Sequence, residues 1–243
     1  MQYWAITDAG CVREQNQDTY QIEKLDKNTL LCLVCDGMGG AKAGNVASAL
    51  AAEVFVDEIR RTWKENMEQA QIDQMLQAAV KLANFTVFDQ GRQFEEFSGM
   101  GTTLVAMLVT ERETTVVNVG DSRAYRINEG GISRITVDHS VVEMMVQRGE
   151  LTREEARNYP GKNFITRAVG TETIADSDLF HLDLQQGDFL LLCSDGLSNS
   201  VDEQEILFEV VHGDEKEKCC QQLLDIAKNR GAPDNVTCVL VQI

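Results

Sequence analysis

Two apolar segments far apart in this chain end in the same dipeptide, Asp-Gly. The segment LLCLVC leads into Asp36 and Gly37, and the segment FLLLCS leads into Asp195 and Gly196. An apolar run of this length that is bounded by turn residues predicts a buried β-strand. Each aspartate is therefore expected at the tip of a buried strand, followed by a glycine that allows the backbone to approach a ligand closely.

Two further aspartates have similar surroundings. Asp121 follows the apolar segment TTVVNVG, and Asp234 directly precedes the segment NVTCVLVQI. Gathering four carboxylates at the mouths of buried strands is unfavourable unless a positive charge lies between them. Carboxylate oxygens are hard ligands, which favour magnesium or manganese over zinc or copper. The sequence therefore predicts a carboxylate-rich site that holds more than one divalent metal ion.

The charge balance argues against nucleic acid as a partner. The chain has 39 acidic and 22 basic side chains, and its formal net charge is −17. Binding to a phosphate backbone needs clusters of lysine and arginine, and this composition does not favour them.

No feature divides the chain or directs it to a membrane. The 243 residues include only two prolines and no linker-like stretch, so we expect a single domain over residues 1–243. The apolar runs are shorter than the roughly 20 residues of a membrane span, and the first residues lack the pattern of a signal peptide. We therefore expect a cytoplasmic protein without membrane insertion.

The cysteines are interpreted as structural. Seven cysteines without an export signal indicate a reducing compartment. Cys32 and Cys35 have the C-x-x-C spacing of some zinc and redox sites, but they lie in a predicted strand. Residues three apart on a strand point to opposite faces, so we expect these two thiols to be buried as small apolar side chains.

The order of the predicted elements favours an α+β fold. A helix is expected after the first Asp-Gly turn, because Ala47, Leu50, Ala51 and Val54 fall on one helical face. Further helices are expected over about 72–93, 203–211 and 215–228, and strands over about 3–9, 29–35, 102–110, 114–119, 123–127, 132–135, 178–184, 188–194 and 235–241. These elements do not alternate as βαβ units. We therefore expect two antiparallel sheets packed face to face and flanked by helix pairs, a four-layer α-β-β-α sandwich.

A mixed segment from Asp138 to Gly170 separates the strands of this order. It is expected to hold one helix over about 141–147 and a second helix opened by Thr152, with Glu155 three residues on as its capping-box partner.

Two polar or glycine-rich segments have open interpretations. In CVREQNQDTY, Arg13 could bind an anion, because arginine suits bidentate contact with phosphate, and Asp18 could support the metals. An ordinary exposed loop is the competing interpretation. In GMGTT, the residues Gly99, Gly101 and Thr102 fit either a plain turn into a strand or a backbone that passes close under a ligand.

Motifs of covalent catalysis are missing from the sequence. No cysteine has an arginine six residues further on, as in the phosphate-binding loop of cysteine phosphatases, and G-x-S-x-G is also missing. A metal-activated water is therefore the expected nucleophile.

Eight motifs in order make the chain similar to the metal-dependent protein phosphatases of the 2C family, in their short bacterial form. The motifs are VREQNQD, VCDGMGG, GMGTT, NVGDSRAY, TVDHS, NFITRAVG, LLCSDGLSN and PDNVT. The resemblance covers nearly the whole chain. It implies a β-sandwich flanked by helix pairs, and hydrolysis of phosphoserine and phosphothreonine in proteins with two or three Mn²⁺ or Mg²⁺ ions. It also implies direct attack by a water that bridges two metals, without a phosphoenzyme.

The resemblance assigns the metal ligands residue by residue. By this resemblance, Asp36 bridges two metals, and the carbonyl of Gly37 binds one of them. Asp195 and Asp234 complete the ligand set of the other, and Asp121 joins Asp195 at a weaker third metal.

Arg13 matches the arginine that binds the phosphate, and two positions depart from the common pattern. Gln17 stands where many members have glutamate before the aspartate that is Asp18 here; both are expected to support the metals indirectly, Gln17 through its carbonyl or a water. Met38 stands where animal members have a histidine proposed as general acid, and methionine cannot donate a proton.

The segment of about 138–166 resembles the flap that lies beside the site in this family, and we expect it to contact the protein substrate. The implied partners are phosphorylated proteins, including a bacterial serine/threonine kinase and its targets. Three alternatives are a small-molecule phosphohydrolase or nuclease, a non-catalytic module that binds phosphoproteins, and a structural calcium site. The last lacks its D-x-D-x-D-G loop.

Overall fold

The computed structural model describes residues 1–39, 43–111, 113–157, 159–213 and 215–243. The strands are β1 (Gln2–Asp8), β2 (Asp18–Lys24), β3 (Leu30–Met38), β4 (Gly101–Thr102), β5 (Leu104–Val109), β6 (Thr114–Val119), β7 (Arg123–Asn128), β8 (Gly131–Arg134), β9 (Asp178–Leu182), β10 (Phe189–Cys193) and β11 (Val236–Gln242). The helices are α1 (Ala43–Thr62), α2 (Gln69–Gln93), α3 (Val141–Gln147), α4 (Arg153–Arg157), α5 (Asp195–Ser198), α6 (Glu203–His212) and α7 (Lys216–Asn229), with a 3₁₀ turn at Glu95–Phe97.

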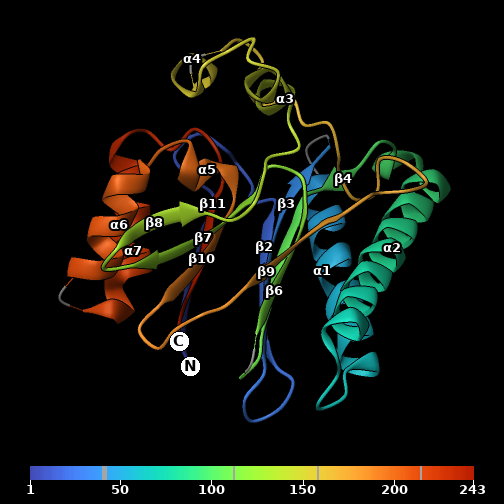
Figure 1. The fold of residues 1–243 in the computed structure, drawn as a ribbon. Helices are drawn as coiled ribbons and strands as arrows, with labels where there is room; N and C mark the ends of the chain where they lie inside the picture. The colour runs from blue at the N-terminus through green and yellow to red at the C-terminus, as the bar shows by residue number, and fades with distance from the viewer. Residues whose placement is uncertain (40–42, 112, 158, 214) are drawn as a thin grey trace.

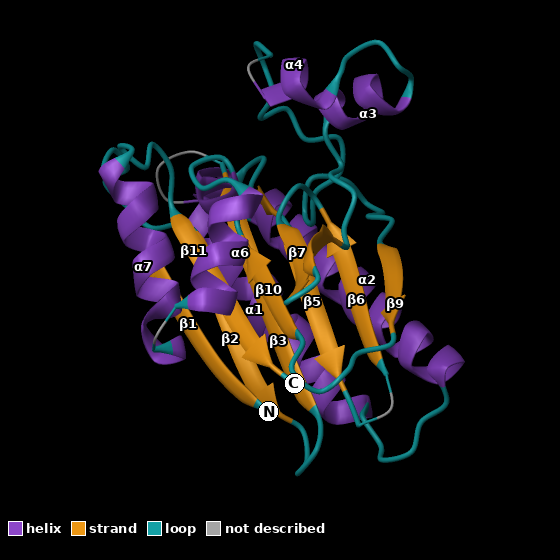
Figure 2. Cartoon of the chain, turned by 60° about the vertical axis from the view of Figure 1, so that its left-hand side comes forward, coloured by secondary structure: helices purple, strands orange, loops and turns teal. Residues whose placement is uncertain are grey.

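Two antiparallel sheets form the centre of the molecule (Figure 1). One has the strand order β1-β11-β10-β7-β8. The other has the order β2-β3-β5-β6-β9, and the short β4 pairs with β3. The helices α1 and α2 cover the outer face of the second sheet, and α6 and α7 cover that of the first (Figures 1 and 2). The predicted four-layer α-β-β-α sandwich is confirmed.

Strand β3 shows why these segments are apolar along their whole length. Leu31, Leu33 and Cys35 pack in the core under α1 and α2, whereas Cys32 and Val34 pack in the core between the sheets. Both faces of the strand are covered, so every position from Leu30 to Cys35 is buried. Cys32 and Cys35 lie on opposite faces, as predicted.

Two strand predictions were wrong. No strand was predicted between the first strand and the one near residue 29, yet Asp18–Lys24 forms β2 and pairs with β3. This strand lies at a sheet edge and is mostly half-buried, so its sequence DTYQIEK contains no apolar run to mark it. The predicted strand 102–110 is divided into β4 and β5.

The mixed segment projects from one end of the sandwich and carries α3 and α4 (Figure 2). The range of α3 and the capping box of α4 agree with prediction: the Thr152 N–H donates to Glu155 Oε2 over 2.8 Å, and the Glu155 N–H donates to Thr152 Oγ1 over 3.2 Å. No helix in the described ranges has the length and apolar character to cross a bilayer.

Candidate metal centre

Five aspartates meet at the end of the sandwich that carries α3 and α4. Asp18 opens β2, Asp36 lies in β3, Asp121 follows β6, Asp195 opens α5 directly after β10, and Asp234 precedes β11. Their proximity is evident at Asp36. Burial raises the pKa of this carboxyl well above its usual range, and the charges of the other four aspartates raise it further. One prediction needs correction, because Asp36 lies within β3, opposite Asp18 on β2, and not at a strand tip.

The backbone of Asp36 is held by the GMGTT segment. Its N–H donates to Thr103 Oγ1 over 2.9 Å, and its carbonyl accepts from the Thr103 N–H and from Thr102 Oγ1, both over 2.9 Å. Thr103 Oγ1 in turn lies 2.7 Å from Ser122 Oγ, next to Asp121. This segment, whose role the sequence left open, therefore clamps Asp36 in place.

Gly37 lies where no side chain fits. A Cβ added to it would collide with the carbonyl oxygen of Gly44, and its N–H donates to the Gln17 carbonyl over 3.1 Å. A Cβ on Gly44 would lie 2.8 Å from the Gly37 carbonyl oxygen and 2.7 Å from Gln17 Cδ. Gly44 is a residue that the sequence analysis missed. Its missing side chain leaves the Gly37 carbonyl uncovered on that side.

Asp18 carries an unsatisfied oxygen. The residue is 7% exposed, and its Oδ2 accepts a hydrogen bond of 2.7 Å from Ser194 Oγ. Its Oδ1 is buried without a hydrogen-bond partner in the described part of the chain. Burial raises the pKa of Asp18 to about 7. A buried carboxylate oxygen of this kind is costly unless a cation lies near it.

Asp121 and Asp195 have similarly raised pKa values. Burial, followed by the charges of Asp195 and Asp138, raises the pKa of Asp121 to about 8. Burial and the charge of Asp234 raise the pKa of Asp195, while a hydrogen bond with Asp36 lowers it. Burial among like charges therefore raises the pKa of both carboxyls, and a cation between them would oppose this effect.

Arg13 contacts the group through Asp234. Its Nη2 donates to Asp234 Oδ2 over 2.8 Å, and its side chain is 55% exposed. The hydrogen bond and the charge of Asp234 raise the pKa of Arg13, and the charges of Asp36 and Asp195 add to this effect. Arg13 therefore faces the carboxylates from the rim of the site.

Asn235, which the sequence analysis did not single out, anchors the loop that carries Arg13. Its Oδ1 accepts from the Gln17 N–H over 2.9 Å, and its Nδ2 donates to the carbonyls of Ala9 and Gln15, both over 3.0 Å. The Asn in PDNVT was the available signal, because a buried amide beside a turn usually satisfies backbone groups of a neighbouring loop.

These residues fit divalent cations. The donors are all hard oxygens, one of them buried and unpartnered, and four of the carboxyls have pKa values raised by burial among like charges. Among the described residues, no group of three His, Cys, Asp or Glu side chains already has the arrangement of metal ligands. Instead Asp234 binds Arg13, and Asp36 and Asp195 share a hydrogen bond.

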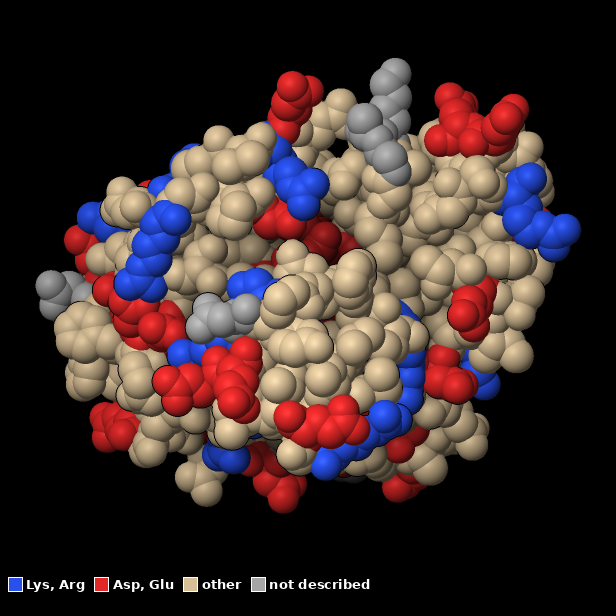
Figure 3. Space-filling view, turned by 90° about the horizontal axis from the view of Figure 1, so that it is seen from above, with Lys and Arg blue, Asp and Glu red and all other residues tan. Residues whose placement is uncertain are grey.

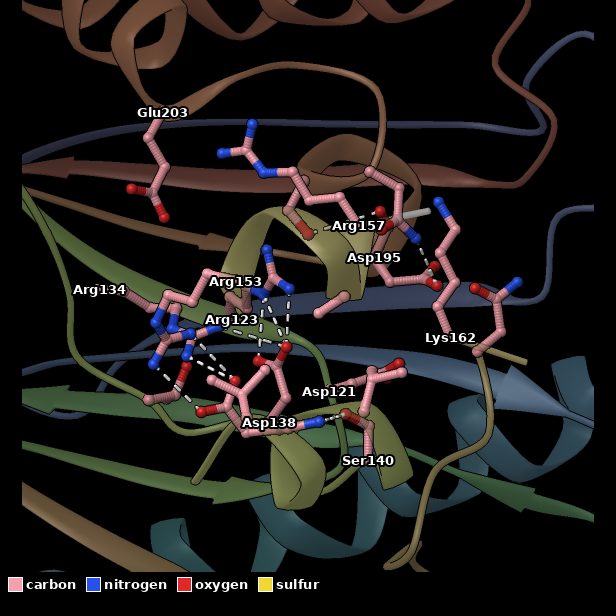
Figure 4. A pocket seen from close by; sticks show the side chains of 18 of the residues that line it. Asp121, Arg123, Arg134, Asp138, Ser140, Arg153, Arg157, Lys162, Asp195 and Glu203 are labelled. Atoms are coloured by element: carbon pink, nitrogen blue, oxygen red, sulfur yellow. Dashed lines mark hydrogen bonds and ion pairs between the residues drawn. The ribbon is translucent and has the colours of Figure 1, made fainter. Parts of the chain in front are cut away.

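A cavity of about 680 Å³ opens beside the acidic group. Asp121 and Asp195 lie on its wall, and α3 and α4 border it opposite the segment from Ser198 to Glu203. Its basic lining residues are Arg123, Arg134, Arg153, Arg157, Lys162 and Arg230. Figure 3 looks into this end of the molecule and shows acidic atoms deep in a hollow with basic side chains around it, and Figure 4 shows the lining from close by.

Comparison with protein families gives one match that covers most of the chain. The sequence profile described as protein phosphatase 2C matches residues 12–232. The chain is 35% identical over 243 residues to the serine/threonine phosphatase stp of Listeria monocytogenes, covering 97% of this chain and 93% of that protein.

Solved structures agree with this match. The crystal structure of the serine/threonine phosphatase Stp1 from Staphylococcus aureus has a TM-score of 0.91 and 39% identity, over 99% of this chain and 94% of that one. The catalytic domain of the serine/threonine protein phosphatase PstP, solved in complex with 2 manganese ions, has a TM-score of 0.84 and 32% identity, over 99% and 97% of the two chains.

Proposed function

The chain belongs to the protein phosphatase 2C family, and we infer that it is a metal-dependent serine/threonine protein phosphatase built around its five aspartates. The observation that carries this inference is the meeting of five aspartates from different strands and helices at one end of the sandwich, with Asp36 among the other four. Such a group is stable when divalent cations lie within it.

We propose that Asp36, Gly37, Asp121, Asp195 and Asp234 hold two or three Mn²⁺ or Mg²⁺ ions. When bound, these ions supply an activated water and offset charge on the phosphoryl oxygens. The clamp from Thr102 and Thr103 fixes Asp36 at the centre of the set, and Gly44 leaves the Gly37 carbonyl accessible.

Asp18 and Gln17 support this set from behind. Asp18 is fixed by Ser194, the residue directly before Asp195, so it positions both β3 and the start of α5. The Gln17 carbonyl accepts from the Gly37 N–H and, over 2.6 Å, from Ser48 Oγ, which fixes the backbone of the Gly37 region.

Arg13 binds the phosphate of the substrate. Its guanidinium is exposed at the rim, where it can exchange the Asp234 carboxylate for two phosphoryl oxygens. This exchange frees Asp234 for a cation and orients the ester for in-line attack. Met38 offers no proton, so the leaving oxygen takes its proton from another source.

Turnover of a phosphothreonine peptide tests the proposal. The protein should hydrolyse the peptide with Mn²⁺ present, stop when the metal is chelated, and recover when Mn²⁺ is restored. Asp36→Asn and Asp234→Asn should lose turnover while the circular dichroism spectrum stays unchanged. If either variant hydrolysed the peptide at the rate of the parent protein, the proposed role of that aspartate would be wrong. Plasmid DNA and a small chromogenic phosphate ester, assayed in parallel, separate this function from a nuclease and from a small-molecule phosphohydrolase.

Phosphorylated proteins are the proposed substrates, including a serine/threonine kinase in the same cytoplasm, and residues 1–243 are proposed to act as one catalytic domain. The flap, residues 138–166 with α3 and α4, borders the cavity beside Asp121 and Asp195, so it is placed to contact the segment around the phosphorylated residue. Exchanging the flap for that of a relative should change the preference among phosphopeptides. A phosphoproteome comparison of cells with and without the protein would identify the substrates.

A further inference from the structure

We propose that Glu143 is a positioning residue that locks the flap over the cavity and so sets the affinity for protein substrates. Its carboxylate ties α3 to the sheet through Arg134 and to α4 through Arg153. The inference rests on the proposed function, because it concerns access of a phosphoprotein to the cavity.

No apolar residue of α3 or α4 is fully buried. Glu143 is the one buried residue of α3, and α4 has none. Large apolar side chains of the flap face solvent instead: Met144 is 39% exposed and Phe164 is 69% exposed. Segments with so few buried apolar contacts open at low free energy, so a small number of polar contacts decides their position.

Backbone hydrogen bonds fix only the stem of the flap. The Val141 N–H donates to the Phe164 carbonyl over 2.9 Å, and the Thr166 N–H donates to the His139 carbonyl over 2.7 Å. These bonds join the two ends of the segment. They leave the placement of α3 and α4 above the cavity to side chains.

Glu143 supplies contacts to both helices, alongside an ion pair of 3.3 Å between Arg157 of α4 and Asp202. Its Oε2 accepts from Arg134 Nη2 over 3.0 Å and from Arg153 Nη1 over 3.2 Å, and its Oε1 accepts from Arg153 Nη2 over 3.2 Å. The side chains of Glu143 and Arg134 are only 7% and 15% exposed, whereas that of Arg153 is 65% exposed. Burial acts to raise the pKa of Glu143, but the two arginines outweigh it and lower the pKa, so the carboxylate is ionised.

The contacts continue toward the metal centre. Arg134 Nη1 also donates to Asp138 Oδ2 over 3.3 Å, and Arg123 donates to the same carboxylate over 2.7 Å. Arg123 lies two residues after Asp121. The ion-pair network Arg123–Asp138–Arg134–Glu143–Arg153 therefore runs from the metal centre to α4, with alternating charges (Figure 4 labels all of its members except Glu143).

Removing the Glu143 charge should release the flap and leave the metal centre intact. The substitution Glu143→Gln keeps the size of the side chain, removes its charge and leaves one acceptor oxygen in place of two. Amide hydrogen exchange over residues 141–157 should become about fivefold faster or more. KM for a phosphothreonine peptide should rise about tenfold, with kcat for a small chromogenic ester within about twofold of the parent. Glu154→Gln, an exposed acid on α4, is the matched control and should change neither quantity.

Arg153→Gln provides a second variant, because Arg153 is exposed and its loss should be tolerated by the fold. It should shift exchange and KM in the same direction, by less than Glu143→Gln. The proposal is overturned if both variants keep parental exchange in the flap and a parental KM. A parent protein that does not hydrolyse the peptide would contradict the proposed function instead, and hydrogen exchange would still test the lock.

Discussion

The metal centre and the flap are both rich in charged side chains, but the pKa values of their buried carboxyls are shifted in opposite directions. In the metal centre, Asp18 and Asp121 have raised pKa values, because they are buried near other carboxylates. In the flap, Glu143 has a lowered pKa, because it is buried between two arginines. The chain itself neutralises Glu143, whereas at Asp18 and Asp121 burial beside other carboxylates dominates, an arrangement that favours a bound cation.

The two regions also differ in what positions them. Asp36 is fixed by β-sheet pairing and by three hydrogen bonds from Thr102 and Thr103, within a core covered on both faces. The helices of the flap have one buried residue between them, and it is a charged one. Rigid strands therefore hold the aspartates, and ion pairs hold the segment that we propose contacts substrates.

The largest effect is expected from Asp36→Asn. Turnover should fall by about 10³-fold or more, because the residue at the centre of the ligand set loses its charge. In the presence of a chelator, the variant should at the same time be more stable than the parent. Asparagine carries no charge, so it is not repelled by the neighbouring buried carboxylates. Peptide turnover and thermal unfolding, each with Mn²⁺ and with a chelator, measure both effects. Asp57→Asn, on the exposed surface of α1, is the control. A variant that is less stable than the parent when both are chelated would show that the carboxylates do not repel one another.

Arg13→Ala should have the next largest effect. Loss of a charge-assisted contact to the phosphoryl group should lower kcat/KM by about 10²-fold. The kcat/KM of Arg13→Lys should lie between those of Arg13→Ala and the parent, because lysine keeps the charge and loses the bidentate geometry. Steady-state kinetics on the peptide provide the measurement, with Arg61→Ala as control, since Arg61 pairs with Glu58 on the surface of α1. Equal rates for Arg13→Ala and the parent would remove Arg13 from the site.

The meeting of four aspartates could be predicted because each follows or precedes an apolar run. Strand burial is a local property of sequence, and it places Asp36, Asp121, Asp195 and Asp234 at one end of the sandwich. Asp36 lies within its strand and not at the tip, since β4 extends the pairing of β3 as far as Met38. The apolar run could not show this extension.

The supporting residues could not be predicted in the same way. Gly44 is needed only because α1 passes close to Gly37, and Asn235 only because the loop of residues 9–17 folds over β11. Both contacts join distant parts of the chain, so no local pattern encodes them. Glu143 is similar. Its position in α3 fits no recognisable sequence pattern, and its role depends on Arg134 of β8, which pairs with it in the folded chain.

The pH dependence of stability should differ with and without metal. Asp18 and Asp121 have folded pKa values of about 7 and about 8, above the value of about 4 for an unfolded aspartate. The folded state therefore binds more protons than the unfolded state between these values, and the free energy of unfolding should fall as the pH rises from about 4 to about 8. For the chelated protein the free energy of unfolding should fall by about 1.4 kcal/mol for each pH unit over which one such carboxyl is protonated only in the folded state, measured by urea denaturation at several pH values. Asp121→Asn should flatten the curve. With saturating Mn²⁺ the fall should disappear, because cations replace the protons.

Salt should produce the smallest effect, and it should act on only one of the two regions. At about 0.5 M NaCl the Debye length is only a few ångströms, so the Arg153–Glu143 contact is weakened from its exposed Arg153 side, and amide exchange over residues 141–157 should rise by about twofold. Exchange in β3 should stay the same, because pairing and apolar burial hold that strand. In Arg153→Gln the salt effect on the flap should be lost, because the screened contact is already gone. An equal response of the flap and β3 would mean that salt acts on global stability, and the contrast between a strand-held centre and a charge-held flap would then be wrong.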